Sequence, residues 1–507
     1  MPNFIPGDGP STAKLIIIGE APGATEDEQG KPFVGQSGEL VIDMLEKAGL
    51  SRGDVYITNV CKIRPPNNDL SRLSEYGKTL DDFIPILWNE INAIKPNAIL
   101  ALGDTALKVL TGKTGIRKYR GSILESINGF PKVIPSVHPA NLLEHRSGGM
   151  WKWRDKVYFQ LDFNKAVYES TFSDFSSIPH RNLWVCKHST DFIKYLMRNK
   201  DEKKVALDIE SYRATPLCIA LAFNKSEAIS IPLVDLLTTT NPIGITITEM
   251  TNLWEILLDL LYDERILKIG QNFKFDERIL RTFGFNLRGF HSDTMLKFHE
   301  LYPELPKSLQ FQTSILTNEP YYKDEGREYN PKKDDLSRLL LYNARDAAVT
   351  REIDDILEEE LSERGLKDYY YEFRMKTHYF YMHIEDQGIL LNKRRHDEVV
   401  EKYRNKLEIN DKSLYRLVGR EFNIDSRPQV CNLLYNELNL PKRTERRANG
   451  KSTLTANEKA LMTLSANVKM SVEKKEILNC IMTHRNIQKT LGTYLGIPKF
   501  YIAEKSD

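Results

Sequence analysis

Residues 205–211 read VALDIES, an apolar run that ends in two acids separated by one residue. Such a run predicts a buried β-strand. Because alternate side chains of a strand point to the same face, Asp208 and Glu210 are expected to project together. Two carboxylates that face one site repel each other unless a cation lies between them. The stretch therefore predicts a metal site at the end of a strand.

Two later segments supply further oxygen ligands. The segment QNFKFD places Asp276 four residues after Asn272, and the segment YNARD places Tyr342 and Asp346 on one face of a helix. Four carboxylates and a phenol suit two magnesium or manganese ions. Two such ions would clamp a phosphodiester for attack by a water that the phenol orients. Each motif alone is common, and it is their order on suitable elements that indicates a nuclease.

The segments VALDIES, QNFKFDERIL and YNARDAAVT resemble the three exonuclease motifs of the DEDD superfamily, tyrosine subtype. This is the proofreading domain of family A, or polymerase I-like, DNA polymerases. The resemblance implies a ribonuclease H-like fold with a mixed sheet and 3′→5′ removal of nucleotides from a DNA 3′ end. It also implies a role for each motif residue. Two Mg²⁺ (or Mn²⁺) ions would be bound by Asp208, Glu210, Asp276 and Asp346. Tyr342 would orient the attacking water, and Asn272 would contact the substrate.

The first part of the chain alternates short apolar strands, among them KLIIIG, AILALG and KVIPSV, with helical stretches. This alternation predicts an α/β sheet whose site lies at the strand ends. Glu20, Asn59 and His138 each fall at the end of a predicted strand. The amide of Asn59 can read a base edge, Phe33 can stack on a flipped base, and His138 offers a donor to a developing anion. These residues predict a base pocket.

The segments GEAPGATEDEQGKPFVGQSG, ITNVCKIRPP, ALGDTAL and PSVHPANLL resemble uracil-DNA glycosylases of the family 4 type. The resemblance implies a three-layer α/β/α domain that excises uracil from DNA. It implies that Glu20 orients the attacking water or stabilises the sugar cation, and that Asn59 selects the base edge of a flipped pyrimidine. It further implies that Phe33 stacks on the base and that His138 binds its O2.

The cysteines depart from that family. Family 4 enzymes usually hold an iron–sulfur cluster on four cysteines, but Ile63 and Phe83 stand at two of the expected positions and Cys61 has no partners. A cluster needs its thiolates, so we expect no iron–sulfur cluster and expect the two apolar residues to fill the volume. Three alternatives follow for this domain: it excises uracil, it excises another modified pyrimidine, or it only binds DNA.

From about residue 369 the sequence favours helices. The stretches MHIEDQGILLN, FNIDSRPQVCNLLYNELNLP, KSTLTANEKALMTL and HRNIQKTLGTYL resemble the start of the family A polymerase module, up to the thumb. A thumb would use a basic run to track DNA phosphates, and the side chains expected to do so are Lys442, Arg443, Arg446, Arg447 and Lys451. Palm and fingers motifs do not follow. We therefore expect no primer extension by this polypeptide alone, and a separate palm–fingers polypeptide as an implied partner.

Composition agrees with an α/β multidomain protein. Hydrophobic residues make up 41% and charged residues 28%, which excludes a mainly disordered chain. The net charge of +1 limits DNA contacts to local basic patches. No run of about 18 apolar residues occurs, so no membrane association is expected. The five well-separated cysteines are typical of reduced thiols, which predicts a cytoplasmic protein. The polymerase resemblance implies that the cell is bacterial or phage-infected.

These patterns predict one division of the chain: a glycosylase-like domain (1–168), a linker (169–180), an exonuclease domain (181–368), a helical thumb-like region (369–497) and a tail (498–507). The leading interpretation is the N-terminal portion of a replicative, phage-like family A DNA polymerase that binds primer–template. One alternative is a standalone DNA repair nuclease-glycosylase. Another is a chain whose first domain serves only in DNA binding or assembly.

Overall fold

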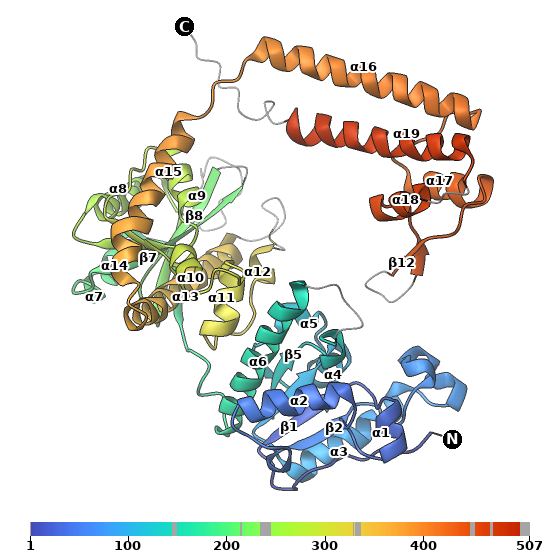
Figure 1. Cartoon of the computed structure of the whole chain (residues 1–507). Coiled ribbons are helices and arrows are strands. Elements are labelled where there is room, and N and C mark those ends of the chain that lie inside the picture. Colours follow the sequence, from blue (N-terminus) through green and yellow to red (C-terminus); the bar gives the residue numbers. More distant parts are fainter. Residues whose placement is uncertain are drawn as a thin grey trace. The chain divides into compact units, whose positions relative to one another are not determined.

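The computed structural model describes residues 2–143, 150–212, 215–233, 245–327, 329, 336–446, 452–466 and 470–496. The chain divides into two compact units, Met1–His383 and Ile384–Asp507. The first unit contains two separate β-sheets, and the second is mainly helical (Figure 1). Among the described residues, no helix has both the length and the apolar character needed to cross a bilayer.

The first sheet consists of short, buried strands. In spatial order they are β2 (Tyr56–Asn59), β1 (Leu15–Gly19), β3 (Ala98–Leu102), β5 (Lys132–Ser136) and β4 (Leu124–Glu125). All pair in parallel except β4, which is antiparallel to β5. Every residue of β1 and β3 is buried, as expected for parallel strands covered on both faces.

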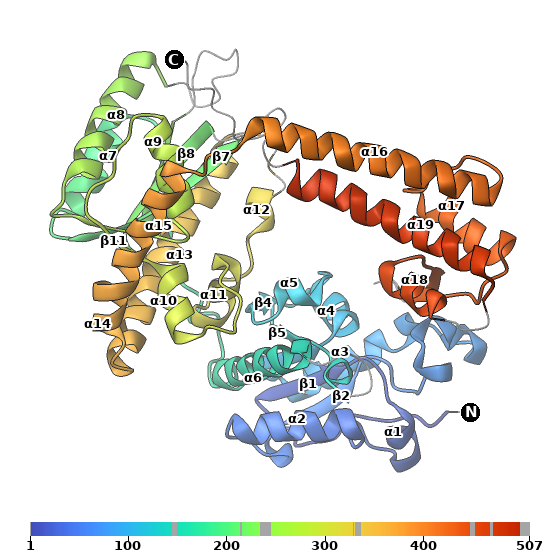
Figure 2. The same ribbon diagram turned by 45° about the horizontal axis from the view of Figure 1, so that its top comes forward.

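Helices cover both faces of this sheet (Figure 2). They are α1 (Ala24–Gln29), α2 (Gln36–Lys47), α3 (Ile84–Ile94), α4 (Asp104–Thr111), α5 (Ile116–Tyr119) and α6 (Met150–Ser170). On β1, Leu15 and Ile17 join the core beneath α2 and α6, whereas Ile16 and Ile18 join the core beneath α3 and α4. This alternation follows from the pleat of the strand. The predicted three-layer α/β/α domain is confirmed.

The second sheet has six strands of mixed direction. In spatial order they are β11 (Phe290–Asp293), β10 (Leu267–Gly270), β7 (Lys204–Tyr212), β8 (Thr215–Asn224), β9 (Glu227–Pro232) and β6 (Asn182–Val185). Strands β7, β8 and β9 form an antiparallel meander, and β10 and β11 add in parallel beside β7. The mixed sheet expected from the exonuclease motifs is confirmed.

One long helix, α13 (Leu336–Glu363), carries the predicted site residues Tyr342 and Asp346 and packs against this sheet. The helices of this part of the chain are α7 (Ser189–Arg198), α8 (Ile247–Tyr262), α9 (Lys274–Thr282), α10 (Thr294–Leu301), α11 (Leu309–Leu316), α12 (Asp324–Arg327), α13 (Leu336–Glu363), α14 (Lys367–Tyr369) and α15 (Met375–Gln387). Helix α13 packs on the sheet through Ala344, Ala347 and Ala348, which meet Ala206 and Ala220 in one buried cluster. Small side chains on both surfaces let the helix lie close to β7, so polar groups on the two elements can meet.

The two sheet-containing parts of the first unit are joined by buried polar contacts. Arg120, whose buried side chain forms a 2.5 Å ion pair with Asp162 of the same part, donates across to Ser314 Oγ at 3.3 Å. Lys165 on α6 donates to the backbone oxygens of Gly121 at 3.0 Å and Ser314 at 3.0 Å. Buried charges are tolerated only when they are paired or hydrogen-bonded, as these are. The contact is therefore a specific one.

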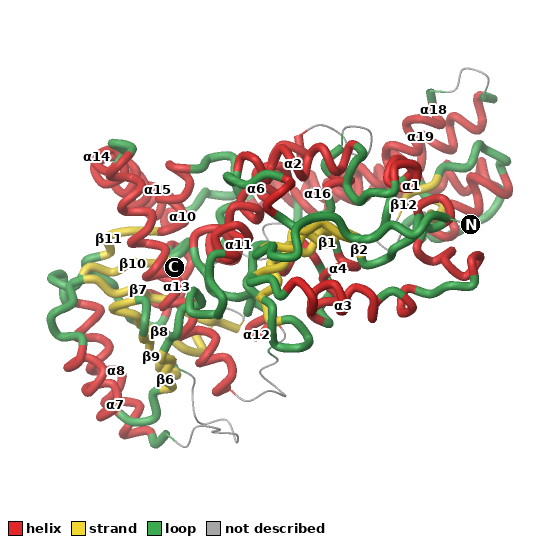
Figure 3. Tube along the Cα trace, turned by 90° about the horizontal axis from the view of Figure 1, so that it is seen from below, coloured by secondary structure: helices red, strands yellow, loops and turns green. Residues whose placement is uncertain are grey.

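The second unit, in its described residues, consists of helices and one hairpin (Figure 3). Its elements are α16 (Lys393–Val418), α17 (Arg427–Asn432), β12 (Thr444–Arg446), β13 (Ser452–Leu454), α18 (Glu458–Ser465) and α19 (Val472–Lys489). Leu414, Leu434, Leu461 and Ile481 lie in its core. Helix α19 ends at Lys489 and continues as a wider turn over Thr490–Tyr494.

Candidate active sites

Three predicted metal ligands meet between β7 and α13. Asp208 and Glu210 project from β7, and Asp346 projects from α13. One carboxylate oxygen from each lies within 4.8 Å of the others. The pleat of the strand and the close approach of the helix together produce this convergence. We call these three residues the acidic cluster.

The fourth predicted ligand, Asp276, lies nearby on α9. It is buried, and it is not part of the group whose oxygens lie within 4.8 Å of one another. Burial raises the pKa of its carboxyl, and the negative charges of Asp208 and Glu210 raise it further. The Asp276 side chain therefore interacts electrostatically with Asp208 and Glu210, although it is not a member of the acidic cluster.

Burial makes the acidic cluster unfavourable without a cation. Burial raises the pKa of Asp208, and the charge of Asp346 adds to the effect. Burial likewise raises the pKa of Glu210, followed by the charge of Asp208. A divalent cation between the carboxylates would reverse both effects, and hard oxygen ligands are those that Mg²⁺ and Mn²⁺ prefer. The residues present therefore fit the metal ions implied by the exonuclease motifs.

Tyr342 and Asn343 complete the site from α13. The Tyr342 hydroxyl accepts a hydrogen bond from Lys323 Nζ at 3.1 Å, and its ring is mostly buried. Asn343 Nδ2 donates to Asp208 Oδ2 at 2.7 Å, while Asn343 Oδ1 accepts from Ser230 Oγ at 2.7 Å. Asn343 was not among the predicted site residues, although a polar residue inside a metal motif on a buried helix face is a usable signal.

Asn272 occupies a special backbone position. Its φ is 55°, in the left-handed region, and its backbone N–H donates to Asp293 Oδ1 at 3.0 Å. It lines a cavity of about 320 Å³ together with Asp293, His299 and Arg374. The structure thus places Asn272 at a turn that leads into α9 and toward Asp276.

A second site lies at the carboxyl ends of the parallel strands of the first sheet. Glu20 follows β1, Asn59 ends β2 and His138 follows β5, so all three reach the same edge. Together with Phe33 they line a cavity of about 490 Å³. The structure therefore brings together the four residues that were predicted to form a base pocket.

A glycine makes this convergence possible. A Cβ atom on Gly19 would lie 2.5 Å from Asn59 Oδ1 and 2.5 Å from Phe33 Cζ, closer than real contacts allow. Phe33 itself has a φ of 54°, and its carbonyl accepts from Arg52 at 3.1 Å. Glu26 secures the same loop by accepting from the backbone N–H groups of the two glycines that flank it, Gly23 and Gly35. The glycine-rich loop therefore forms one wall of the cavity and is held in place by these hydrogen bonds.

Two polar contacts orient the catalytic candidates in this pocket. Thr105 Oγ1 donates to Glu20 Oε2 at 2.5 Å. The Ala140 backbone N–H donates to His138 Nδ1 at 3.3 Å. A ring nitrogen that accepts carries no proton, so a neutral His138 has its proton on Nε2. Thr105 was missed, although it lies in the quoted segment ALGDTAL.

Comparison with known proteins assigns each part of the chain. The family model described as uracil DNA glycosylase superfamily matches residues 6–162. The chain is 40% identical over 147 residues to a type-4 uracil-DNA glycosylase of Thermotoga maritima, covering 29% of this chain and 74% of that protein. The chain belongs to the type-4 uracil-DNA glycosylase family over this first domain.

The remaining parts match DNA polymerase families. A 3′-5′ exonuclease family matches residues 185–362, and DNA polymerase family A matches residues 393–506. A DNA polymerase of Bacillus phage SP01 is 26% identical over 286 residues, which cover 55% of this chain and 29% of that protein. The chain thus spans under a third of the phage polymerase. The order is glycosylase, exonuclease and polymerase, as the sequence motifs predicted.

One solved structure adds a looser similarity. The polymerase domain of Pol1 from M. smegmatis, in complex with DNA primer-template and dNTP, aligns with a TM-score of 0.40 at 16% identity. The alignment covers 64% of this chain and 51% of that one.

The glycosylase domain does not offer the thiols of an iron–sulfur cluster. Cys61 is buried, and its Sγ donates to the Ile63 carbonyl at 3.2 Å. Cys61, Ile63, Leu73 and Phe83 pack as one apolar cluster, and burial raises the pKa of the Cys61 thiol. The next cysteine along the chain is Cys186. Because a cluster is held by thiolates, the residues around Cys61 do not fit one.

The predicted thumb contacts lie around the β12–β13 hairpin. Lys442 and Arg443 are exposed just before β12, and Arg446 is its last residue. Arg447 and Lys451 lie outside the described residues. The phosphate contacts of this basic run stay a prediction.

Proposed function

We propose that the middle part of the chain, about residues 181–368, is a metal-dependent 3′→5′ exonuclease that proofreads DNA. The observation that carries this proposal is the convergence of Asp208, Glu210 and Asp346 within 4.8 Å, beside Tyr342 on the same helix as Asp346. The match to a 3′-5′ exonuclease family supports the reaction class.

The chain's own groups have distinct tasks in this proposal. Asp208, Glu210 and Asp346 would hold two divalent ions, with Asp276 completing the set. When bound, such ions supply charge neutralisation at the scissile phosphate and a more acidic water. Asn343 holds the Asp208 carboxylate in place through its 2.7 Å hydrogen bond. The Tyr342 hydroxyl, on a mostly buried side chain, would orient the attacking water.

We propose that the first domain, about residues 1–168, excises uracil or another modified pyrimidine from DNA. The 490 Å³ cavity, lined by Phe33, Asn59 and His138, supports this activity. Phe33 would stack on the flipped base and Asn59 would pair with its edge. The Nε2 proton of His138 would stabilise charge on the departing base, and Glu20 would orient water at the sugar. A domain that only binds DNA is the competing proposal.

The two activities together suit a DNA polymerase that inspects its template and its primer end. Residues 369–497 would form the thumb and contact primer–template, with 169–180 as the linker. The lack of primer extension by this polypeptide, and completion by a separate palm–fingers polypeptide, stay predictions.

One experiment tests both activities. The purified chain is incubated with an end-labelled, uracil-containing primer–template, with and without chelator. We expect Mg²⁺-dependent shortening from the 3′ end that chelation abolishes, and abasic-site formation that chelation leaves intact. Asp208→Ala with Glu210→Ala should reduce trimming by at least about 1000-fold and leave excision unchanged. Trimming that persists in this double variant would overturn the exonuclease assignment. Absence of excision from any modified pyrimidine would favour the DNA-binding alternative.

A further inference from the structure

We propose that Lys323 is the resident counter-cation of the exonuclease site and competes with divalent metal ions for Asp346. In this role it sets the metal concentration at which the site fills. The inference rests on the exonuclease function proposed above. It concerns a residue outside the three exonuclease motifs.

The Lys323 ammonium lies on the acidic cluster. Its Nζ donates to Asp346 Oδ1 at 2.6 Å and to Asp346 Oδ2 at 2.5 Å, and it also reaches the Tyr342 hydroxyl at 3.1 Å. The Lys323 side chain is only 11% exposed. A buried ammonium beside several carboxylates supplies the charge that the cluster needs when metal is absent.

Asp346 cannot serve the lysine and a metal ion at full strength together. Its Oδ1 accepts from the Tyr322 hydroxyl at 2.5 Å in addition to Lys323. A carboxylate oxygen has about two lone pairs, so Oδ1 is already saturated. A divalent ion about 2.1 Å from an Asp346 oxygen would also lie within about 5 Å of the ammonium, where like charges repel. Withdrawal of Lys323 therefore favours metal binding at Asp346.

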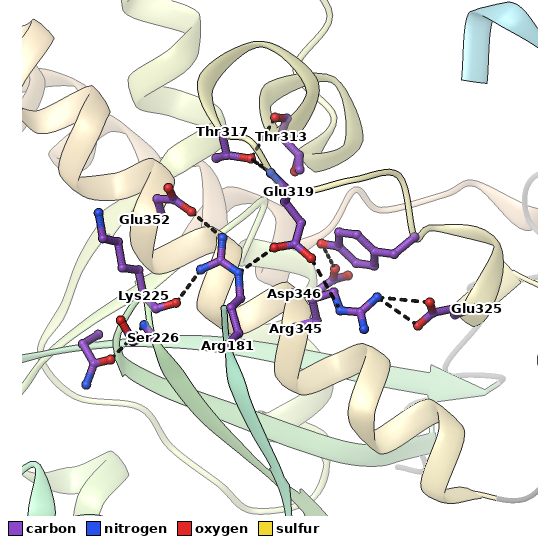
Figure 4. A network of polar contacts seen from close by, with 12 residues as sticks. Arg181, Lys225, Ser226, Thr313, Thr317, Glu319, Glu325, Arg345, Asp346 and Glu352 are labelled. Carbon is purple, nitrogen blue, oxygen red and sulfur yellow. Dashed lines mark hydrogen bonds and ion pairs between the residues drawn. The ribbon is translucent and has the colours of Figure 1, made fainter. Parts of the chain in front are cut away.

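The backbone that carries Lys323 is held in place on the exonuclease side. Glu319 lies between Arg181, at 2.7 Å, and Arg345, at 3.7 Å (Figure 4). Arg345 also pairs with Glu325 at 3.0 Å. These ion pairs fix residues 317–327, which we call the lysine segment, against α13.

The same segment is held by the glycosylase domain on its other side. The Tyr321 backbone N–H donates to Ser122 Oγ at 3.2 Å, and the rings of Tyr119 and Tyr321 meet edge-on at 5.2 Å. Asp324 forms an ion pair with Lys118. Because the backbone is held from both sides, release of Asp346 requires rotation of the Lys323 side chain rather than movement of the lysine segment.

The molecule provides space for that rotation. Lys323 lines a cavity of about 220 Å³ together with Ser122 and Ser314, and the wall also carries the cations Arg117, Lys118 and Arg120. The hydroxyl oxygens can accept a hydrogen bond from an ammonium group, whereas the three cations make this position less favourable than the one on Asp346. Lys323 therefore lies on Asp346 when metal is absent and has room to turn away when a metal ion takes its place.

The test measures metal binding directly, without DNA or turnover. Mn²⁺ binding to the full chain is followed by electron paramagnetic resonance of the free ion. The Asp208→Ala, Glu210→Ala double variant identifies the binding that belongs to the acidic cluster. Lys323→Met keeps an unbranched side chain, one atom shorter than lysine, and removes its charge. We expect that variant to bind Mn²⁺ at the cluster about tenfold more tightly than the unchanged chain.

Lys225→Met is the matched control, because Lys225 is an exposed lysine of the same domain. It should bind Mn²⁺ like the unchanged chain. Equal or weaker Mn²⁺ binding by Lys323→Met would overturn the inference while leaving the exonuclease assignment standing. Failure of the unchanged chain to bind Mn²⁺ at the cluster would overturn both. If Lys323→Met does not fold, Lys323→Gln replaces it, with the same supporting and contradicting results.

Discussion

Asn343 on α13 donates a hydrogen bond from its amide to Oδ2 of Asp208 on β7, across 2.7 Å. Asn343 Nδ2 also donates to the Asp208 backbone oxygen at 3.1 Å, and Asn343 Oδ1 accepts from Ser230 Oγ at 2.7 Å. Asn343 is fully buried, so no water competes for these bonds. The contact therefore fixes both the carboxylate of a proposed metal ligand and the distance between its strand and the helix that carries Asp346.

Replacing Asn343 with alanine should weaken the exonuclease site without removing a ligand. Partners of metal ligands typically change metal affinity or activity by about 10- to 100-fold. We expect Asn343→Ala to raise the Mg²⁺ concentration needed for half-maximal trimming by about that factor. Ser230→Ala removes only the second contact and should have a smaller effect. An unchanged Mg²⁺ requirement in Asn343→Ala would show that Asp208 is positioned by other contacts.

Gly19→Ala should damage the base pocket selectively. The added methyl would lie 2.5 Å from both Asn59 Oδ1 and Phe33 Cζ, so one of them has to move. We expect at least about 100-fold slower excision, since a shift of about 1 Å in a positioned group has that consequence. Trimming should be unaffected. Gly53→Ala is the matched control, because its Cβ would meet only Ser51 Oγ, at 3.7 Å.

His138→Ala tests the proposed donor to the departing base. Loss of one such donor typically costs about 100- to 1000-fold in rate. We expect a loss of that size in single-turnover excision, with little change in DNA affinity, because the donor acts on charge that develops in the transition state. A proportionate loss of DNA affinity would instead assign His138 to binding.

Iron analysis tests the cysteine argument. Cys61 stands in an apolar cluster with Ile63 and Phe83, and the expected ligand positions carry no thiols. We expect the anaerobically purified chain to contain no stoichiometric iron or acid-labile sulfide. About four iron atoms per chain would contradict this expectation and require ligands other than cysteine.

Lys165 gives the first unit a pH-dependent stability. Its burial lowers the pKa of the amine to about 8, below its value in an unfolded chain. The folded state then binds fewer protons than the unfolded state between pH 8 and about 10.4. The charged, buried amine therefore lowers the free energy of unfolding at neutral pH. This destabilisation disappears as the pH rises from about 8 to about 10.4 and the amine loses its proton. Urea unfolding should show the free energy of unfolding rising with pH relative to Lys165→Met. The opposite trend would place a charged Lys165 at the contact at all these pH values.

Much of the fold could be predicted because its signals are local. The buried strands β1, β3 and β5 appear as short apolar runs, and VALDIES identifies β7 with its two acids by alternation alone. The helical spacing of Tyr342 and Asp346 was equally readable. The roles of Lys323 and Thr105 could not be predicted, because neither residue belongs to a local pattern. Each contacts its site through a hydrogen bond to a residue more than twenty positions away.

By itself, the amino-acid sequence determined the order of the three parts, the strands and helices that carry the acids, and the four residues that line the cavity of the first domain. Periodicity and short motifs encode such properties, which depend on neighbours along the chain. Only the tertiary structure decided that Asp276 lies outside the acidic cluster, that Asn343 holds Asp208, and that an ammonium lies on Asp346. Those facts depend on how closely α13 packs on its sheet, and that distance is set by small side chains meeting across the core.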